Sequence, residues 1–285
     1  MRTRVLLCFA VMLLSCLAVA AQQAPMRPLT FWYDYTINPG KDDQFLELVK
    51  TVGAPVRDKL MADGVVLAWG VQAPLLRVPG SATHTIWYAV ADWSGVEKVQ
   101  TAMQTQIARL NEEAAKSGAA KKGSTAAQGP TARVMEVADV SKTHDYLTRD
   151  LVFAVTQTPP TAGVLPYTRY NFTKVKPGKA ADYRKAWEKY NKPVLDKLLA
   201  DGVIAAYGLA VEEVRTSGDF THFTWYDVKE LAQFEKVRSA FLADRDHRSQ
   251  EEQNAINELF ATLTDPDAAR SEVDHAVIFK VQGMK

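Results

Sequence analysis

The chain has 285 residues, of which 47% are apolar and 24% are charged, and its formal net charge at pH 7 is +1. This length allows one large domain or two of ordinary size, and the apolar fraction is typical of a soluble globular core. The near-zero charge gives the chain no general attraction for nucleic acid or for an anionic membrane surface.

The first 21 residues have the pattern of a secretory signal peptide. Two arginines precede the apolar run Val5–Leu17, and the small residues at 18–20 suit a signal peptidase. This run is shorter than the roughly 20 residues that cross a bilayer as a helix, so we expect no membrane span. We predict a signal peptide at 1–21 and a periplasmic or secreted mature chain. A lipoprotein modified at Cys16 is the less favoured alternative.

Both cysteines of the chain, Cys8 and Cys16, lie inside this predicted signal peptide. The mature chain would therefore contain none. That excludes disulfides, a cysteine nucleophile, thiolate metal sites and covalently attached c-type haem from the mature protein.

One stretch of the sequence occurs twice. Residues 55–71 read PVRDKLMADGVVLAWGV and residues 193–209 read PVLDKLLADGVIAAYGL, with 11 of 17 positions identical. The offset is 193 − 55 = 138, and it also relates the two Thr-His-x-x-Trp-Tyr segments at 83–88 and 221–226. The sequence therefore predicts an internal duplication.

The first copy begins, after a lead-in, with a strand over Phe31–Thr36. We match it to Tyr170–Thr173, one residue out of the 138 register, and attribute the shift to a one-residue insertion. A helix follows in each copy, with apolar residues at helical spacing over 45–60 and 183–198. The proline inside each helix predicts a kink or a new helical start, and the Asp-Gly pair after it predicts the helix end.

Two further strands and a second helix follow in each copy. The predicted strands cover 65–72 and 83–91 in the first copy and 203–212 and 221–228 in the second. Ser94 and Glu97 form a predicted capping box for the second helix of the first copy. Its frayed end and a mobile loop are expected over 112–129, whereas the second copy continues with an amphipathic segment at 249–263. Apolar strands at 151–155 and 277–281 end the copies.

Each copy therefore reads strand, helix, strand, strand, helix, strand, which is the ferredoxin-like order. We predict an α+β protein of two tandem ferredoxin-like βαββαβ repeats, at 29–157 and 165–283, joined by a linker at 158–164. One such sheet leaves a face uncovered, so we expect the two repeats to pack sheet to sheet as an intramolecular barrel.

This order of elements, the helix that ends in Asp-Gly before a strand, and the aromatic strand at Trp87-Tyr88 resemble the dimeric α/β-barrel superfamily. That group includes antibiotic-biosynthesis-type monooxygenases and haem-handling proteins, and tandem copies occur among chlorite-dismutase-like proteins and dye-decolourising peroxidases. The resemblance covers about residues 29–283. It implies a barrel with a ligand pocket and makes haem a candidate cofactor. Of the peroxidase-type Gly-x-x-Asp-Gly pattern, only Asp63-Gly64 is present.

The two histidines of the repeated Thr-His pair are the first candidates for a site. His84 would share a strand face with Tyr88, and His222 with Tyr226, so that a histidine and a tyrosine could together bind a polar ligand. Alternatively, both histidines stand at the start of a strand and hydrogen-bond the hairpin there.

Strand residues supply the other candidates. Asp34 and Asn171 would occupy equivalent positions, and Asp34 could act as a general base. Trp87 and Trp225 could stack on a flat ligand, although aromatic residues on strands usually belong to a core. His247 and Glu251, at i and i+4 spacing, could contribute to a metal or haem site, or they could belong to a solvated helix face.

No diagnostic catalytic motif emerges, so we predict an exported protein that binds a small aromatic or apolar ligand in a barrel pocket. The predicted ligand-binding residues are His84, Tyr88, His222, Tyr226, Asp34, Asn171, Trp87 and Trp225. One alternative is a monooxygenase-type or haem-dependent oxidoreductase, and another is a structural or interaction module of the cell envelope. A homodimer is a further expectation.

Overall fold

The computed structural model describes residues 27–78, 81–118, 128–156, 163–215 and 219–283. Within them eight strands form a closed barrel: β1 (Leu29–Tyr35), β2 (Val66–Pro74), β3 (His84–Val90), β4 (His144–Val155), β5 (Tyr167–Val175), β6 (Ala206–Val214), β7 (His222–Val228) and β8 (Thr264–Val281). Neighbouring strands pair antiparallel in the order β1-β3-β2-β8-β5-β7-β6-β4. The predicted signal peptide, 1–21, lies outside the described residues.

The barrel consists of two half-sheets with the same internal order. The first four strands are arranged β4-β1-β3-β2 and the last four β8-β5-β7-β6. The halves join through hydrogen bonds at the edges, β2 to β8 and β4 to β6. The expectation of two sheets packed face to face is thus replaced by edge-to-edge closure, which leaves no sheet edge unpaired in the barrel.

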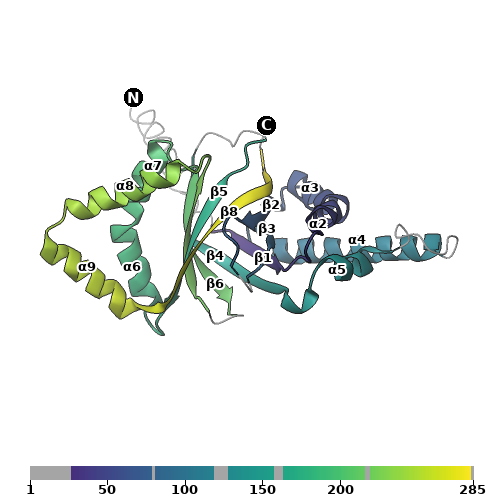
Figure 1. Ribbon diagram of the computed structural model, residues 1–285, viewed down its shortest axis with the longest axis horizontal. Coiled ribbons are helices and arrows are strands. Elements are labelled where there is room, and N and C mark those ends of the chain that lie inside the picture. The colour runs from purple at the N-terminus through teal and green to yellow at the C-terminus, as the bar shows by residue number, and fades with distance from the viewer. Residues whose placement is uncertain (1–26, 79–80, 119–127, 157–162, 216–218, 284–285) are drawn as a thin grey trace, which may run out of the picture.

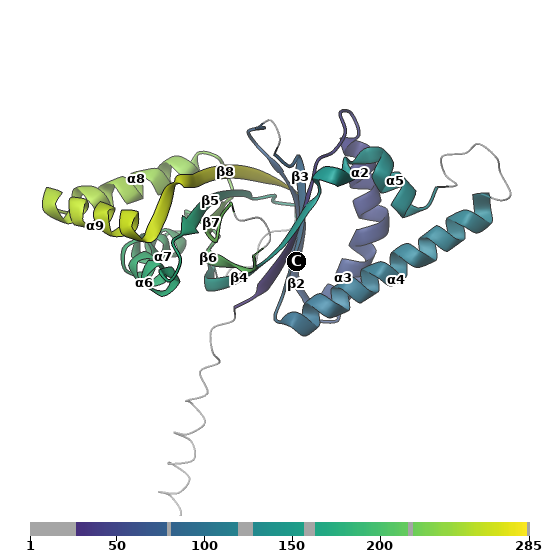
Figure 2. The same cartoon turned by 90° about the horizontal axis from the view of Figure 1, so that it is seen from below.

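Helices cover the outside of the barrel in two groups on opposite sides (Figures 1 and 2). The first half carries α2 (Asp42–Leu48), α3 (Ala54–Ala62), α4 (Trp93–Gly118) and α5 (Pro130–Val137). The second half carries α6 (Ala180–Tyr190), α7 (Lys192–Ala200), α8 (Gln233–Asp246) and α9 (Gln250–Leu263). Among the described helices, none combines the length and apolar character needed to cross a membrane.

The helix interruptions follow the sequence expectation. Pro55 and Pro193 lie in the first turn of α3 and α7. In the first half a π-helical turn, Val49–Gly53, links α2 to α3. Gly64 and Gly202 have φ of 76° and 68°, the left-handed conformation that ends a helix. The predicted proline breaks and glycine stops are confirmed.

The pairing of the first strand in each half corrects one alignment. Tyr35 pairs with His84 and Thr173 pairs with His222, so 173 − 35 = 222 − 84 = 138 and no insertion is needed. The backbone N–H groups of Ile37 and Val175, also 138 apart, donate to the equivalent threonine hydroxyls of the Thr-His pairs, both at 2.8 Å.

Asp34 and Asn171 are therefore not equivalent, as we had predicted, because they differ by 137. Asp34 corresponds to Phe172, and Asn171 corresponds to Tyr33. Because side chains alternate along a strand, a shift of one residue moves each side chain to the opposite face of the sheet.

Strand alternation divides the core into an interior and two outer layers. The barrel interior holds an aromatic cluster of Trp32, Tyr146, Tyr170, Phe172, Phe220 and Phe223, with Trp87 and Trp225 packed against it. Separate apolar clusters lie between the sheet and the helices of each half. The residues on the outer face of the sheet, rather than the interior, therefore meet the helices.

Several local expectations change. Helix α4 starts at Trp93, and Asp92 Oδ1 accepts the backbone N–H of Gly95 at 3.0 Å, so the predicted capping box at Ser94 is wrong. The helix continues to Gly118, into the predicted mobile segment, whose residues 119–127 lie outside the described residues, as does most of the linker. Helix α5 was not expected. Strand β8 has 18 residues and begins well before the predicted 277–281. The prediction was too short because the first part of the strand is polar and lacks an apolar pattern.

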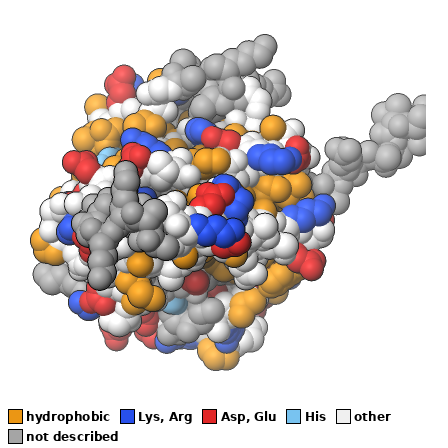
Figure 3. Space-filling model, turned by 90° about the vertical axis from the view of Figure 1, so that its right-hand side faces the viewer, with side chains coloured by type: hydrophobic (Ala, Val, Ile, Leu, Met, Phe, Trp, Pro, Cys, Tyr) orange, Lys and Arg blue, Asp and Glu red, His pale blue; other side chains and the backbone are white. Residues whose placement is uncertain are grey.

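The face formed by the first-half helices shows Lys and Arg side chains interspersed with Asp and Glu (Figure 3). Many of these charges pair over one helical turn, such as Arg109 with Glu113 and Lys116 with Glu112. No large area of one sign is visible in this view, in keeping with the net charge of +1.

Candidate functional site

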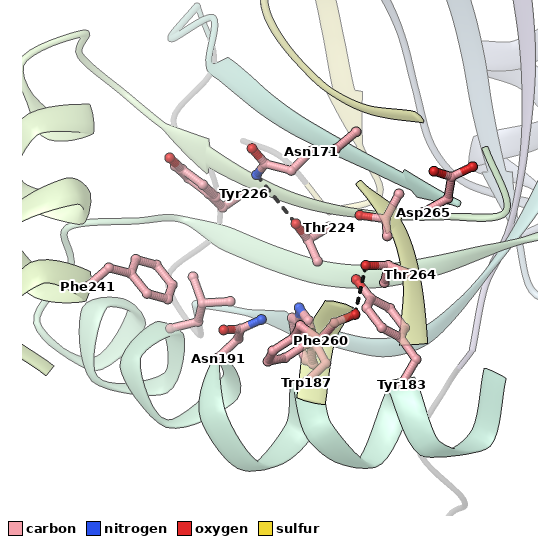
Figure 4. A pocket seen from close by; sticks show the side chains of 13 residues that line it. Asn171, Tyr183, Trp187, Asn191, Thr224, Tyr226, Phe241, Phe260, Thr264 and Asp265 are labelled. Atoms are coloured by element: carbon pink, nitrogen blue, oxygen red, sulfur yellow. Dashed lines mark hydrogen bonds between the residues drawn. The ribbon is translucent and has the colours of Figure 1, made fainter. Parts of the chain in front are cut away.

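A cavity of about 370 Å³ lies in the second half, between the outer face of the sheet and the helices (Figure 4). Strands β5, β7 and β8 form one wall, and α6, α7, α8 and α9 supply the other. The lining residues are Asn171, Thr173, Tyr183, Trp187, Asn191, Leu195, Thr224, Tyr226, Phe241, Phe260, Thr264, Asp265 and Ala269. Seven of these 13 residues are aromatic or aliphatic and six are polar. A small-molecule site likewise combines apolar walls with polar groups that orient the ligand.

At three positions the first half carries larger side chains than the cavity wall of the second half. With the 138 register, Tyr33 stands where the second half has Asn171, and Tyr35 where it has Thr173. On the helix opposite, Arg57 corresponds to Leu195. These three exchanges remove volume on the strand side and at α7, whereas the helix positions of Val49 and Gly53 hold the larger Trp187 and Asn191 in the second half.

The first-half counterpart is filled and hydrogen-bonded. Gln100 Nε2 donates to the hydroxyl oxygens of Tyr33 and Tyr88, at 2.6 and 3.1 Å. Arg57 is buried, with its guanidinium 5.6 Å from the ring centre of Trp69, and its Nε has no hydrogen-bond partner among the described residues. Burial lowers the pKa of Arg57 and raises the pKa of Tyr33. Tyr33, Arg57 and Tyr88 stand at the positions that Asn171, Leu195 and Tyr226 hold in the cavity wall.

Polar groups converge on one corner of the cavity. Asn171 Oδ1 accepts hydrogen bonds from Ser271 Oγ at 2.8 Å and from Arg169 Nε at 3.3 Å. Asn171 Nδ2 contacts Thr224 Oγ1 at 3.4 Å. Arg169 also hydrogen-bonds the Tyr226 hydroxyl, although burial still raises the pKa of Tyr226. This corner joins β5, β7 and β8.

The two candidate histidines lie beneath the start of the first helix of their half. His84 packs against Phe45, with ring centres 5.2 Å apart, and His222 packs against Tyr183 at 5.3 Å. In both, Nδ1 contacts the preceding threonine hydroxyl, at 3.3 and 2.9 Å. Neither histidine lines the cavity. Their repeated Thr-His pair thus ties a strand end to its neighbouring backbone.

The histidines differ at Nε2. His84 Nε2 lies 3.9 Å from Asp42 Oδ1, whereas the equivalent position near His222 is Ala180, and His222 Nε2 is buried with no partner among the described residues. Burial, aided by Arg215, lowers the pKa of His222 to about 4, and burial also lowers the pKa of His84. Both side chains are therefore neutral at pH 7.

Three of the predicted site residues point to the barrel interior instead. Trp87 and Trp225 pack in the interior aromatic cluster. Asp34 accepts a hydrogen bond from Thr85 Oγ1 at 2.6 Å, and burial raises its pKa to about 6. The predicted residues are therefore divided between two faces of the sheet, and the cavity brings together only Asn171 and Tyr226 of the eight.

Sequence reasoning missed most of the cavity wall. Trp187, Leu195 and Phe260 occur in amphipathic helices, where they are indistinguishable from ordinary core residues. The available signal was the size difference between equivalent positions of the two copies, above all Arg57 against Leu195 within the repeated stretch.

The pair His247 and Glu251 does not share a helix, as its spacing suggested. His247 caps the C-terminus of α8, Glu251 belongs to α9, and both are exposed. Among the described residues, no group of three or more His, Cys, Asp or Glu could hold a metal ion.

The donor set of the cavity does not fit haem. Haem iron is held by histidine, cysteine, methionine or tyrosinate side chains, and the lining includes none of the first three. Tyrosines 183 and 226 line the cavity, but burial raises the pKa of both, which disfavours a tyrosinate ligand.

Comparison with known proteins gives a likeness of fold. No family model and no curated protein matches the chain. A "putative monooxygenase" from Fusobacterium nucleatum superposes with a TM-score of 0.58 at 10% identity, covering 92% of this chain and 98% of its own. A second "putative monooxygenase", from Lactobacillus acidophilus, gives a TM-score of 0.51 at 11% identity, covering 90% and 97%.

A haem-binding protein from Thermus thermophilus gives a TM-score of only 0.47 at 9% identity, covering 88% of this chain and 91% of its own, and carries no argument about this site. Identities this low show the fold alone. At the level of the fold, the resemblance that the sequence predicted is confirmed.

Proposed function

We propose that the protein binds one small, mainly apolar molecule per chain, in the cavity of its second half. This proposal rests on three equivalent positions at which the first half has a large side chain and the second half a smaller one. The pairs are Tyr33 and Asn171, Tyr35 and Thr173, and Arg57 and Leu195. A fold alone would tolerate the same filling in both halves. Retention of an aromatic-walled cavity in one half is what ligand binding requires.

The chemistry near the cavity favours binding over turnover. The nearest buried histidine, His222, is neutral at pH 7, but a group with a pKa of about 4 is a weak base at that pH. The two lining tyrosines have raised pKa values and hold their protons. Neither His222 nor the two lining tyrosines are therefore well matched to proton abstraction near neutral pH.

Filling the cavity tests the proposal. We expect the neutral fluorescent probe N-phenyl-1-naphthylamine to bind the wild-type protein saturably at one site, and to bind the Asn171→Tyr/Thr173→Tyr variant at least tenfold more weakly. The two tyrosines would restore the ring volume that the first half contains. Fluorescence titration measures both dissociation constants.

The matched control is Tyr33→Phe, at the position of the first half that is equivalent to Asn171. It alters a hydroxyl in the filled region and should leave probe binding unchanged. Equal binding by the filled double variant, with a cooperative thermal transition retained, would locate the probe elsewhere and reject the cavity as the site.

A second candidate is a monooxygenase-type oxidation of the bound molecule. Its support is that two proteins of similar fold, with TM-scores of 0.58 and 0.51, are described as putative monooxygenases, together with the resemblance to monooxygenase-type barrels in the sequence. Oxygen uptake with a dihydroxynaphthalene, measured at an electrode, distinguishes the two. We expect no uptake above the blank, and uptake that disappears in the Asn171→Tyr/Thr173→Tyr variant would favour oxidation.

We also propose that the chain is exported and that its two halves, 29–157 and 165–283, are tandem ferredoxin-like repeats. The signal pattern at 1–21 supports export, and the matching strand orders support the repeats. Fractionation of cells that express the full chain and a Cys16→Ala variant separates the alternatives. A soluble periplasmic or secreted product from both would support signal cleavage, whereas membrane attachment lost in the variant would indicate a lipoprotein.

We also propose, as further alternatives, that the protein is an interaction module of the cell envelope and that it forms a homodimer. The processed protein from the same fractionation can be used to test the second. Sedimentation of the processed protein, with and without N-phenyl-1-naphthylamine, reports its oligomeric state. A dimer that forms in both conditions would support association that does not depend on the cavity.

A further inference from the structure

Asn171 presents its N–H groups, not its oxygen, to the cavity. Arg169 Nε lies 3.3 Å from the side-chain oxygen of Asn171, and a guanidinium has no acceptor, so the atom that it meets must be the amide oxygen. Ser271 Oγ donates to the same oxygen at 2.8 Å. Two donors therefore fix the orientation of this amide, and the Nδ2 group faces Thr224 and the cavity.

Thr224 adds a second donor at the same corner. Its Oγ1 accepts the long contact from Asn171 Nδ2, at 3.4 Å, which directs its own O–H proton to another acceptor. An amide nitrogen carries two protons, and one of them remains after this contact. The corner thus offers one N–H and one O–H to a molecule in the cavity.

This donor pair occurs only in the half that has the cavity. In the first half the equivalent positions hold Tyr33 and Ile86, which offer no such pair. The exchanges that open space therefore also introduce donors into it. Acceptors lie elsewhere on the lining, where Asp265 Oδ1 accepts the backbone N–H of Asp267 at 3.3 Å.

From this geometry we infer that the ligand carries a hydrogen-bond acceptor, such as a ketone or lactone carbonyl, on the part that meets Asn171 and Thr224. This inference rests on the proposed function, because it assigns the chemistry of a molecule in that cavity. A ligand that could only donate at this corner would leave the remaining N–H of Asn171 without an acceptor, and a buried polar group without a partner opposes binding.

Three probes with one bicyclic skeleton test it: 1-tetralone, which has a ketone; tetralin, which has no polar group; and 5,6,7,8-tetrahydro-1-naphthol, which has a hydroxyl. We expect the wild-type protein to bind 1-tetralone about tenfold more tightly than tetralin, as two neutral hydrogen bonds would provide. Isothermal titration calorimetry measures the dissociation constants.

Two variants identify the source of that preference. Asn171→Leu/Thr224→Val removes both donors and should bring the two dissociation constants close together while tetralin still binds. Asn171→Asp keeps an oxygen for Arg169 and Ser271 but turns the other atom into an acceptor, so it should favour the naphthol over the ketone. Tyr33→Phe, in the first half, should change neither ratio.

The outcomes separate the two proposals. A wild-type protein that binds none of the three probes would count against the apolar ligand site itself. Binding of all three with an unchanged ketone preference in Asn171→Leu/Thr224→Val would leave the site in place and overturn the donor assignment.

Discussion

Replacing Gly70 with alanine is expected to lower the free energy of unfolding by about 3 kcal/mol, the upper range for overpacking a core. An added Cβ would lie 2.6 Å from the backbone oxygen of Ile278 and 3.0 Å from the indole of Trp87. Gly70 pairs with Phe279 on β8, at one of the two edges where the halves join. Relief of the clash would move β8 backbone and weaken that edge, because a carbonyl cannot rotate away as a side chain can.

Gly208 is the equivalent position of the second half and provides the matched comparison. There the nearest atoms to an added Cβ all belong to the Trp225 indole, the first at 2.5 Å. Because a side chain can shift more easily than a strand, Gly208→Ala should cost less than Gly70→Ala. Urea denaturation measures both. Equal and small losses would mean that the β2–β8 edge is not closely packed at Gly70.

The duplicated sequence predicted the order of the elements because identical local patterns fold alike. The 138 offset recurs in bonds that no pattern reveals: Trp69 Nε1 donates to Asp58, and the equivalent Tyr207 hydroxyl donates to Asp196. Edge-to-edge closure was not predictable from either copy alone. It depends on which strands reach beyond their own half-sheet. The polar start of β8 pairs with β5 of its own half, and the apolar end, which the sequence predicted as a strand, pairs with β2 of the other half. An apolar pattern predicts such a strand but does not identify its partner.

The error in the first strand shows why faces are harder to predict than strands. Tyr33, Asp34 and Tyr35 alternate, but aromatic residues line both faces of this sheet, so alternation alone does not identify the interior. Matching Asp34 to Asn171 by polarity placed both on one face. Backbone pairing places them on opposite faces.

The predicted site residues differ from most of the cavity lining for a related reason. Residues shared by the copies, such as His84 and His222, were the natural candidates. In the structure, however, they lie at the start of a strand and pack against an aromatic residue of the first helix of their half. Maintenance of the fold preserves what both halves need. A function present in only one half instead appears as a sequence difference between the copies. One such difference, Arg57 in the first copy against Leu195 in the second, lies inside the repeated stretch.

Stability should fall as the pH rises from about 4 to 7, because the barrel interior holds protonated carboxyl groups. Burial raises the pKa of Asp150 and of Asp274 to about 7, and of Asp34 and Asp227 to about 6. In this window the unfolded chain has released protons that the folded chain retains, so deprotonation favours unfolding. His222 acts in the opposite direction, since its lowered pKa costs stability as the pH falls from 6.5 to about 4. These four carboxyl groups with raised pKa values outnumber the two histidines with lowered pKa values, so we expect the carboxyl effect to prevail.

Asp150→Asn isolates one of the two largest contributions. Its carboxyl is 6% exposed and accepts a hydrogen bond from Trp225 Nε1 at 3.1 Å, which an asparagine oxygen can also accept. A rise in the pKa of Asp150 from 3.8 to about 7 destabilises the folded state by at most about 4 kcal/mol. This loss of stability is complete above pH 7 and absent below about pH 4. The difference in unfolding free energy between the variant and the wild type should therefore shift in favour of the variant by a few kcal/mol from pH 5 to pH 8. Urea denaturation at both pH values measures it.

Asp139→Asn is the control for this prediction, because Asp139 is at the surface and its pKa is lowered by hydrogen bonds from Ser141 and Lys142. Removal of that carboxylate should bring no gain at pH 8. If Asp150→Asn shows the same stability difference from wild type at pH 5 and pH 8, Asp150 does not hold its proton in the folded barrel. The interior would then have to stabilise an ionised carboxylate, and its aromatic walls with a single indole donor offer little means to do so.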